Sequence, residues 1–226
     1  MNFLSHFYFE QQSPQPYQAC GMLLPDLVKN AKYSGNLRPH KHPELFDRKE
    51  SLKALLIGWK RHLKVDLIFH QAPFFVLHSA QLKEALKPLL VDTPIRPSFL
   101  GHIGLELLLD HLLVRDNKIH IPAFYEALDE VEKPILNEFL VLSGLTDTDA
   151  FFSFLDQFKS SRYLFSYQKL ENISYALRRI CLRLWPSDFP EARLPELTAC
   201  LGNYLIRIET NYMQIFDEIE LRLGTN

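Results

Sequence analysis

Glycine is scarce in this chain, which has 8 glycines among 226 residues against 17 phenylalanines. Glycine supplies the tight turns and close backbone approaches of phosphate-binding loops, dinucleotide-binding folds and turn-rich β-sandwiches. The shortage therefore disfavours all three. Hydrophobic residues make up 47% of the chain and charged residues 23%, a balance that excludes a disordered protein. Because a chain of this length can bury one large core, we predict a single all-helical domain over residues 1–226.

A surplus of positive charge and a long apolar run are also missing. The net charge is -2, which argues against a nucleic-acid partner. The longest stretch without Asp, Glu, Lys or Arg, from Leu67 to Leu82, contains two histidines and a proline, so we expect no membrane span. The first 28 residues carry no Lys or Arg and so lack the basic start of a secretory signal. We expect a cytoplasmic protein. Its three cysteines show no Cys-x-x-Cys spacing and are predicted to be buried free thiols.

Helical periodicity is the dominant pattern, because apolar residues recur at steps of three and four along most of the chain. The segment 97–114 is apolar around much of its circumference, which predicts a central helix. A buried stripe that includes Trp59, Leu63 and Leu67 is predicted for the first long helix. Loops are expected at 11–20 and 33–43. The predicted helices cover about 48–69, 74–89, 97–114, 122–142, 147–158, 163–184 and 195–223.

Ionisable side chains interrupt two of these apolar helices. They form two ladders with a spacing of four residues: His62, Asp66 and His70 on the first, and His102, Glu106 and Asp110, followed by His111, on the second. Facing helices of a bundle can place such ligands around a metal ion, and imidazole with carboxylate suits Mn, Fe, Mg or Zn. The alternative is that the residues are ordinary hydrogen-bonded or helix-stabilising pairs.

Asp26 is a third polar residue among apolar neighbours, directly after Pro25. Proline favours the first position of a helix, and a helix N-terminus stabilises a carboxylate in its first turn. We therefore expect a helix to begin at Pro25, and this local explanation accounts for Asp26 without a ligand.

Four short motifs together resemble the acyl carrier protein phosphodiesterase family in their order and spacing. They are Met1-Asn2-Phe3-Leu4-Ser5-His6, Gly21-Met22-Leu23-Leu24-Pro25-Asp26, His62-Leu63-Lys64-Val65-Asp66 and Leu109-Asp110-His111. The family is all-helical and distantly related to the HD phosphohydrolases. It removes the 4'-phosphopantetheine arm from holo acyl carrier protein with a divalent metal, usually manganese. In this chain Met22 stands where the family has Asn, Ser5 where Ala is usual, and His70 where an acid is usual.

The resemblance implies an HD-phosphohydrolase-like helical bundle with a metal-dependent phosphodiesterase site. The residues expected nearest the metal are Asp26, His62, Asp66 and Asp110. Those expected to orient them or to act as the acid are His6, His70, His102 and Glu106. Arg178, Arg179 and Arg183 are candidates for phosphate contact, although a solvated basic helix face is an equal alternative. The rival interpretations are a helical binding protein without hydrolytic activity and a hydrolase of another phosphodiester.

Charge is distributed unevenly along the chain. Residues 29–64, here called the basic segment, contain ten lysines and arginines against three acids, a local balance of +7. Because acyl carrier proteins are acidic, a basic patch beside the site would steer such a substrate towards it. Lys49 and Lys53 are the residues expected to take part. The alternative is that these charges only solvate the surface.

Overall fold

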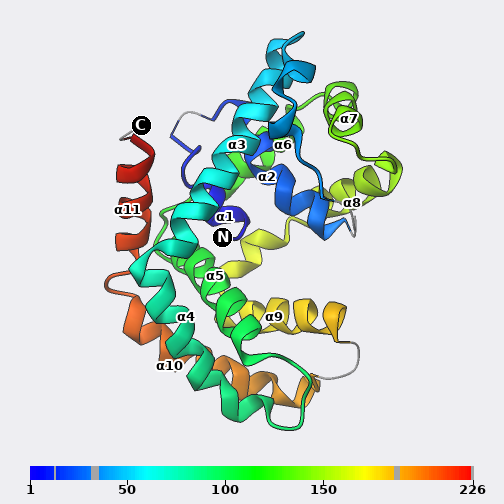
Figure 1. Ribbon diagram of the computed structural model, residues 1–226. Helices are drawn as coiled ribbons and strands as arrows, with labels where there is room; N and C mark the ends of the chain where they lie inside the picture. Colours follow the sequence, from blue (N-terminus) through cyan, green and yellow to red (C-terminus); the bar gives the residue numbers. More distant parts are fainter. Residues whose placement is uncertain (13, 32–35, 186–188, 225–226) are drawn as a thin grey trace. The chain divides into compact units, whose positions relative to one another are not determined.

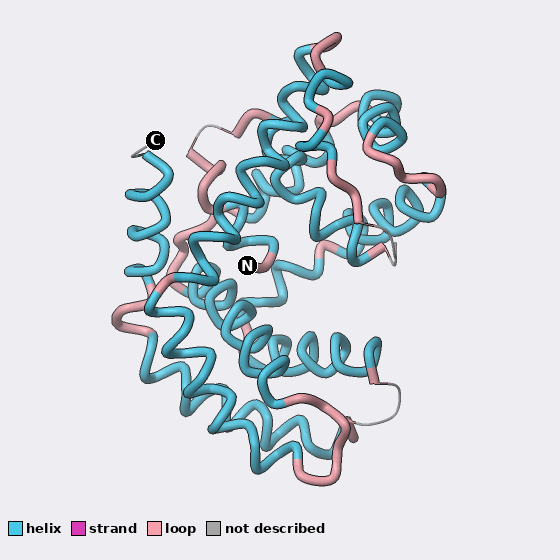
Figure 2. The backbone as a smooth tube through the Cα atoms, viewed as in Figure 1, coloured by secondary structure: helices cyan, strands magenta, loops and turns pink. Residues whose placement is uncertain are grey.

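A computed structural model describes residues 1–12, 14–31, 36–185 and 189–224. Of these residues 79% are helical, and the described part of the chain contains helices and loops but no strand (Figure 2). The prediction of an all-helical protein is confirmed. Within the described residues, no helix combines the length and the apolar character that crossing a bilayer requires.

Eleven α-helices and five short 3-10 helices make up the described part of the chain (Figure 1). In chain order they are α1 (Phe3–Phe7), α2 (Pro16–Asn30), η1 (Pro39–Lys41), η2 (Pro43–Phe46), α3 (Glu50–Gln71), α4 (Pro73–Leu86), η3 (Lys87–Leu90), α5 (Pro97–Arg115), α6 (Ile121–Asp129), α7 (Lys133–Leu142), α8 (Thr148–Ser161), η4 (Tyr163–Gln168), α9 (Leu170–Leu184), η5 (Glu191–Arg193), α10 (Leu194–Ile208) and α11 (Met213–Gly224).

The chain forms two compact units, each assembled from separate segments. The first unit contains residues 1–5, 67–118 and 165–226, and the second contains residues 6–66 and 119–164. The long helix α3 runs through the boundary between Asp66 and Leu67, and the short helix α1 through the boundary between Ser5 and His6.

In the first unit α5 packs along α4 on one side and α9 on another, and α10 packs along α9 (Figure 1). The two helices α4 and α5 approach closely at Gly101, where a Cβ atom would lie 2.8 Å from the backbone nitrogen of Lys83. The leucines of α5 at positions 100, 105, 107, 108, 109, 112 and 113 are all buried. This confirms the prediction that the apolar character of α5 extends around the helix.

A buried carboxylate of α5 fixes the start of α1. The two oxygens of Asp110 accept hydrogen bonds from the backbone nitrogens of Leu4 (3.2 Å) and Ser5 (2.8 Å) and from the Ser5 hydroxyl (2.5 Å). These backbone groups belong to the first turn of a helix and have no partner within it. Asp110 therefore acts as the N-terminal cap of α1, and α1 carries His6 in its next turn.

In the second unit α2 packs against α6 and, through two glycines, against α3. A Cβ on Gly21 would lie 2.1 Å from the carbonyl oxygen of Leu55, and one on Gly58 would lie 2.0 Å from that of Gln18. Only glycine permits such an approach of two backbones. The contact brings the backbone of Met22 beside the middle of α3.

Several predicted boundaries are wrong, and each has a local cause. The predicted loop at 11–20 covers the start of α2, where Pro16 occupies the first turn, and Pro25 lies inside that helix rather than opening it. The predicted helix 122–142 is two helices, α6 and α7, and Pro134 lies in the first turn of α7. The predicted helix 195–223 is also divided, at the turn that contains Tyr212, whose side chain is buried and donates to Asp116.

The buried stripe predicted for α3 ends earlier than its spacing suggests. Trp59 is buried, but Leu63 and Leu67 are 39% and 59% exposed. His62, Val65 and Phe69 occupy the buried face there instead. Of the other predicted features, two lie outside the described residues: Lys32 of the basic segment and residues 33–35 of the loop predicted at 33–43.

Candidate metal centre

Two of the predicted ligands lie one turn apart on α3. His62 is buried, and Asp66 presents a side chain that is 33% exposed. Residues four positions apart share a helix face, and the His62 Nε2 atom lies 3.6 Å from Asp66 Oδ2. The spacing in the sequence is enough to explain this pair.

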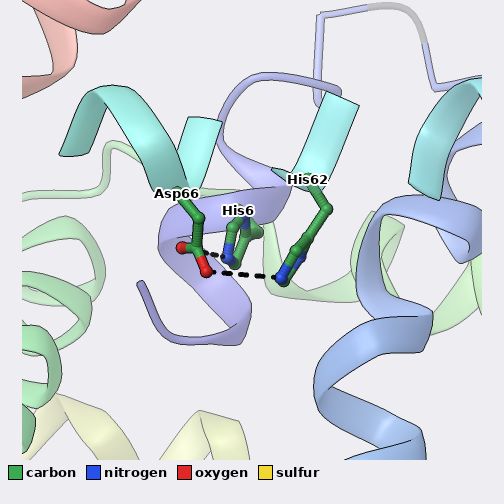
Figure 3. Close-up of side chains that lie close together, drawn as sticks. All are labelled: His6, His62 and Asp66. Atoms are coloured by element: carbon green, nitrogen blue, oxygen red, sulfur yellow. Dashed lines mark ion pairs between the residues drawn. The ribbon is translucent and has the colours of Figure 1, made fainter. Parts of the chain in front are cut away.

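His6 reaches the same place from α1. Its ring stacks on that of His62 with centroids 3.9 Å apart and an interplanar angle of 19°. Its Nε2 atom lies 3.3 Å from Asp66 Oδ1. Figure 3 shows the two rings and the carboxylate converging, with His6 on α1 and the other two on α3. We call His6, His62 and Asp66 the α1–α3 cluster.

The backbone of α2 fixes the orientation of His62. Its Nδ1 atom lies 2.8 Å from the carbonyl oxygen of Met22, and a carbonyl can only accept, so Nδ1 carries the proton. In the neutral form of the ring, Nε2 then keeps the lone pair, and this atom faces Asp66. Metal-binding histidines commonly have this second hydrogen bond, because it fixes both the tautomer and the ring.

His6 is fully buried, and its ring nitrogens make no hydrogen bond of good geometry within the described residues. Burial and, to a lesser extent, the neighbouring His62 lower the pKa of His6 to about 3, against the effect of Asp66. The imidazole is therefore neutral near pH 7. A fully buried imidazole with two unsatisfied nitrogens is costly in an apolar core unless something binds it.

Asp66 is ionised in the same surroundings. Burial opposes its charge, but the His6 imidazole, whose Nε2 atom lies 3.3 Å away, and the His62 imidazole hold the pKa of the Asp66 carboxyl well below its usual range. Neutral imidazoles and an ionised carboxylate are the forms in which these groups bind metal. His6 and Asp66 thus have the protonation states of metal ligands.

Asp26 lies at the edge of this cluster. It projects from the middle of α2, its side chain is 21% exposed, and its Oδ2 atom is 3.9 Å from His6 Nε2. The explanation by a helix N-terminus fails, because Asp26 lies ten residues after the start of α2 at Pro16. A second carboxylate is therefore available beside the α1–α3 cluster.

The distances within the cluster fit a divalent ion. Bonds of about 2.0–2.2 Å in a tetrahedral arrangement place neighbouring donor atoms about 3.3–3.6 Å apart. His6 Nε2 lies 3.3 Å from Asp66 Oδ1 and His62 Nε2 lies 3.6 Å from Asp66 Oδ2, so each imidazole meets its own carboxylate oxygen at such a distance. Three features favour a metal ion at this position: the unsatisfied nitrogens of His6, the fixed tautomer of His62 and the ionised carboxylate of Asp66.

Three other predicted residues form a separate group in the first unit. His70 from the last turn of α3 and His102 and Glu106 from α5 bring their polar atoms together, and we call them the α3–α5 cluster. In the described part of the chain, this group and the α1–α3 cluster are the two sets of three His, Cys, Asp or Glu residues that could hold an ion. Asp110 belongs to neither set, because it caps α1.

Of the remaining predicted residues, Arg178 and His111 have structural partners. Arg178 donates to the carbonyl oxygen of Phe189 at 3.0 Å and lies 3.8 Å from Glu191, while Arg179 and Arg183 are exposed on α9. His111 is buried and pairs with the carbonyl oxygen of Tyr167 at 2.7 Å. All three arginines belong to the first unit, whereas the α1–α3 cluster belongs to the second.

Sequence reasoning missed an ion pair that holds the segment after His6. Glu10 is buried, its Oε1 atom lies 2.7 Å from Arg61 Nε, and its Oε2 accepts from Gln18 at 2.9 Å. Arg61 also donates to the carbonyl oxygen of Phe9 at 3.1 Å. Because Arg61 directly precedes His62, this pair ties the chain beyond His6 to α3. No local spacing connects residues so far apart in sequence, so the pattern gave no signal.

The comparisons with known proteins add no family. No protein-family model, no curated protein and no solved structure matches this chain. The geometry of the α1–α3 cluster and the motifs of the sequence are therefore the features that indicate a function.

Proposed function

We propose that this protein is a metal-dependent phosphodiester hydrolase whose metal is held by His6, His62 and Asp66. The observation that carries the proposal is the convergence of two imidazoles and an ionised carboxylate, with His6 buried and its nitrogens unsatisfied. Asp26, 3.9 Å from His6, supplies a further carboxylate. A divalent metal bound there supplies a water of lowered pKa and neutralises charge on phosphoryl oxygens.

The four side chains of the proposed site have different roles. His62, fixed through Met22, directs its Nε2 lone pair to the metal position, and stacking holds the His6 ring parallel to it. Asp66 contributes the negative charge that attracts a cation. Asp26 is partly exposed, and we assign its Oδ2 atom as the acceptor of a proton from the attacking water.

We further propose holo acyl carrier protein as the substrate, with release of its 4'-phosphopantetheine arm and with manganese as the metal. The resemblance of the four motifs supports this choice, and so does the basic segment. Lys60 and Lys64 lie on α3 one turn apart, beside His62 and Asp66. Lys49 and Lys53 fit a docking role less well, because they pair with Glu138 and Glu50 at 2.6 and 2.8 Å.

Incubation with holo acyl carrier protein and Mn²⁺, followed by intact-mass detection of the apo form, tests the proposal. We expect release of the arm by the native protein and none by Asp66→Asn, with the helical circular dichroism unchanged. His42→Gln is the matched control, because His42 is an exposed histidine of the same unit. Full activity of Asp66→Asn would reject the site. Metal binding without hydrolysis of holo acyl carrier protein or of bis(4-nitrophenyl) phosphate would favour a binding protein instead.

A further inference from the structure

The α3–α5 cluster has the geometry of a second metal site. His102 Nε2 lies 3.0 Å from Glu106 Oε1, His70 Nε2 lies 3.6 Å from the same oxygen, and the two imidazole nitrogens are 3.2 Å apart. Tetrahedral bonds of about 2.0–2.2 Å would place such donors about 3.3–3.6 Å apart. The three polar atoms form a triangle of nearly that size.

Hydrogen bonds among these three atoms satisfy fewer of them than a single metal ion would. A proton on one imidazole can bridge a single pair of atoms, whereas three lone pairs that face one point can all bind one ion. The same Glu106 Oε1 atom also lies 3.2 Å from the amino nitrogen of Met1. A carboxylate that is only 9% exposed therefore lies within 3.6 Å of both imidazoles.

The surroundings hold the two rings in place and leave the site open. The buried ring of Phe75 meets both rings edge-on, with centroids 5.1 Å from His70 and 4.9 Å from His102. His102 and Glu106 lie four residues apart on α5, so one helix face presents both. The side chains of His70 and His102 are 35% and 38% exposed, so an ion from solvent can reach them.

We propose that His70, His102 and Glu106 form a binding site for Zn²⁺ with three protein ligands and a fourth position open to solvent. Two imidazoles and one carboxylate are a ligand set that Zn²⁺ uses when it keeps a water, and imidazole nitrogen favours Zn²⁺, Cu²⁺ and Ni²⁺ over Mg²⁺. The site belongs wholly to the first unit. The proposal does not rest on the hydrolase function proposed for the second.

Zn²⁺ titration against a chromophoric chelator, in the Asp66→Asn background, tests this site separately from the α1–α3 cluster. We expect one tightly held Zn²⁺ that His102→Gln weakens more than about 100-fold, since loss of even an indirect metal partner costs about 10–100-fold. His102→Gln is the preferred variant, because His102 is partly exposed and its replacement leaves the core intact. Glu84→Gln is the control for the further variant Glu106→Gln, because Glu84 is an exposed carboxylate of the same unit.

Two results would overturn the proposal. One is the absence of Zn²⁺ binding in the Asp66→Asn protein while its circular dichroism remains native. The other is unchanged affinity in His102→Gln. Mg²⁺ in place of Zn²⁺ is expected to leave the chelator signal unaltered, and competition by Mg²⁺ at equal concentration would also contradict a nitrogen-rich site. Hydrolytic activity is not a readout here, so failure of this site would leave the proposed function untouched.

Discussion

The contact between α2 and α3 at Gly58 gives a prediction that links packing to the candidate metal centre. A Cβ at this position would lie 2.0 Å from the carbonyl oxygen of Gln18 and 2.6 Å from the nitrogen of Met22. Real Cβ atoms essentially never approach closer than 3.0 Å, so Gly58→Ala requires the helices to separate by about 1.0 Å. The atoms in the way belong to the backbone and cannot rotate aside.

The expected cost follows from two opposing effects. Overpacking of a well-packed contact costs about 1–3 kcal/mol, and exchange of glycine for alanine inside a helix returns about 1 kcal/mol. Because the clash is with backbone, we expect the upper end of the first range and a net loss of about 2 kcal/mol in the free energy of unfolding. Movement of Met22 would also lengthen its 2.8 Å hydrogen bond with His62 and lower the affinity for metal.

Urea unfolding followed by circular dichroism at 222 nm measures this loss. The control is Gly202→Ala on α10, where the nearest atom to a new Cβ is Leu170 Cδ2 at 3.3 Å, the end of a flexible side chain. We expect the control to be as stable as the native protein or slightly more so. Equal stability of Gly58→Ala and Gly202→Ala would refute the close packing of α2 and α3.

Three further predictions concern the second unit. His6 has a pKa near 6.5 in the unfolded chain but of about 3 in the folded protein, so the free energy of unfolding falls as the pH drops between these values. In metal-free protein, the change in urea midpoint between pH 7 and pH 5 should therefore be smaller for His6→Gln than for the native protein. An equal change would contradict a buried neutral imidazole. Arg61→Ala leaves the buried carboxylate of Glu10 without its cation and should cost about 1–3 kcal/mol in the free energy of unfolding. The double variant with Glu10→Gln should recover part of that loss. The absence of any recovery would argue against the ion pair. Replacement of both Lys60 and Lys64 by Glu reverses two positive charges and should raise KM for holo acyl carrier protein at low salt, while hydrolysis of bis(4-nitrophenyl) phosphate stays unchanged. An unchanged KM for the protein substrate would reject docking through this part of the basic segment.

The sequence predicts the long helices well because their signal is local. Apolar spacing places α3, α4 and α5 within a few residues of their ends, and prolines mark the first turns of α4 and α5. It fails at α2, where prolines at 16 and 25 imitate loop and helix-start signals inside one helix. It also fails at Leu63 and Leu67, because periodicity gives the spacing of a stripe but not which neighbour covers each turn.

The candidate sites show the same division between local and distant information. The pairs His62 with Asp66 and His102 with Glu106 follow from a spacing of four residues on one helix. The partners from other elements do not: His6 joins the first pair from α1, and His70 joins the second from the end of α3. Asp110 has the same spacing after Glu106 but binds the backbone of α1. Tertiary packing alone decides between a ligand and a cap.

The binding of a divalent ion by His6, His62 and Asp66 is the central claim, and anomalous diffraction from a Mn²⁺-loaded crystal tests it most directly. We predict an anomalous peak at the manganese edge about 2.0–2.2 Å from His6 Nε2, His62 Nε2 and an Asp66 oxygen, with the His62 Nδ1 bond to Met22 intact. The peak should vanish in crystals of Asp66→Asn. A map without a peak between these three side chains, at saturating Mn²⁺ and neutral pH, would contradict the claim.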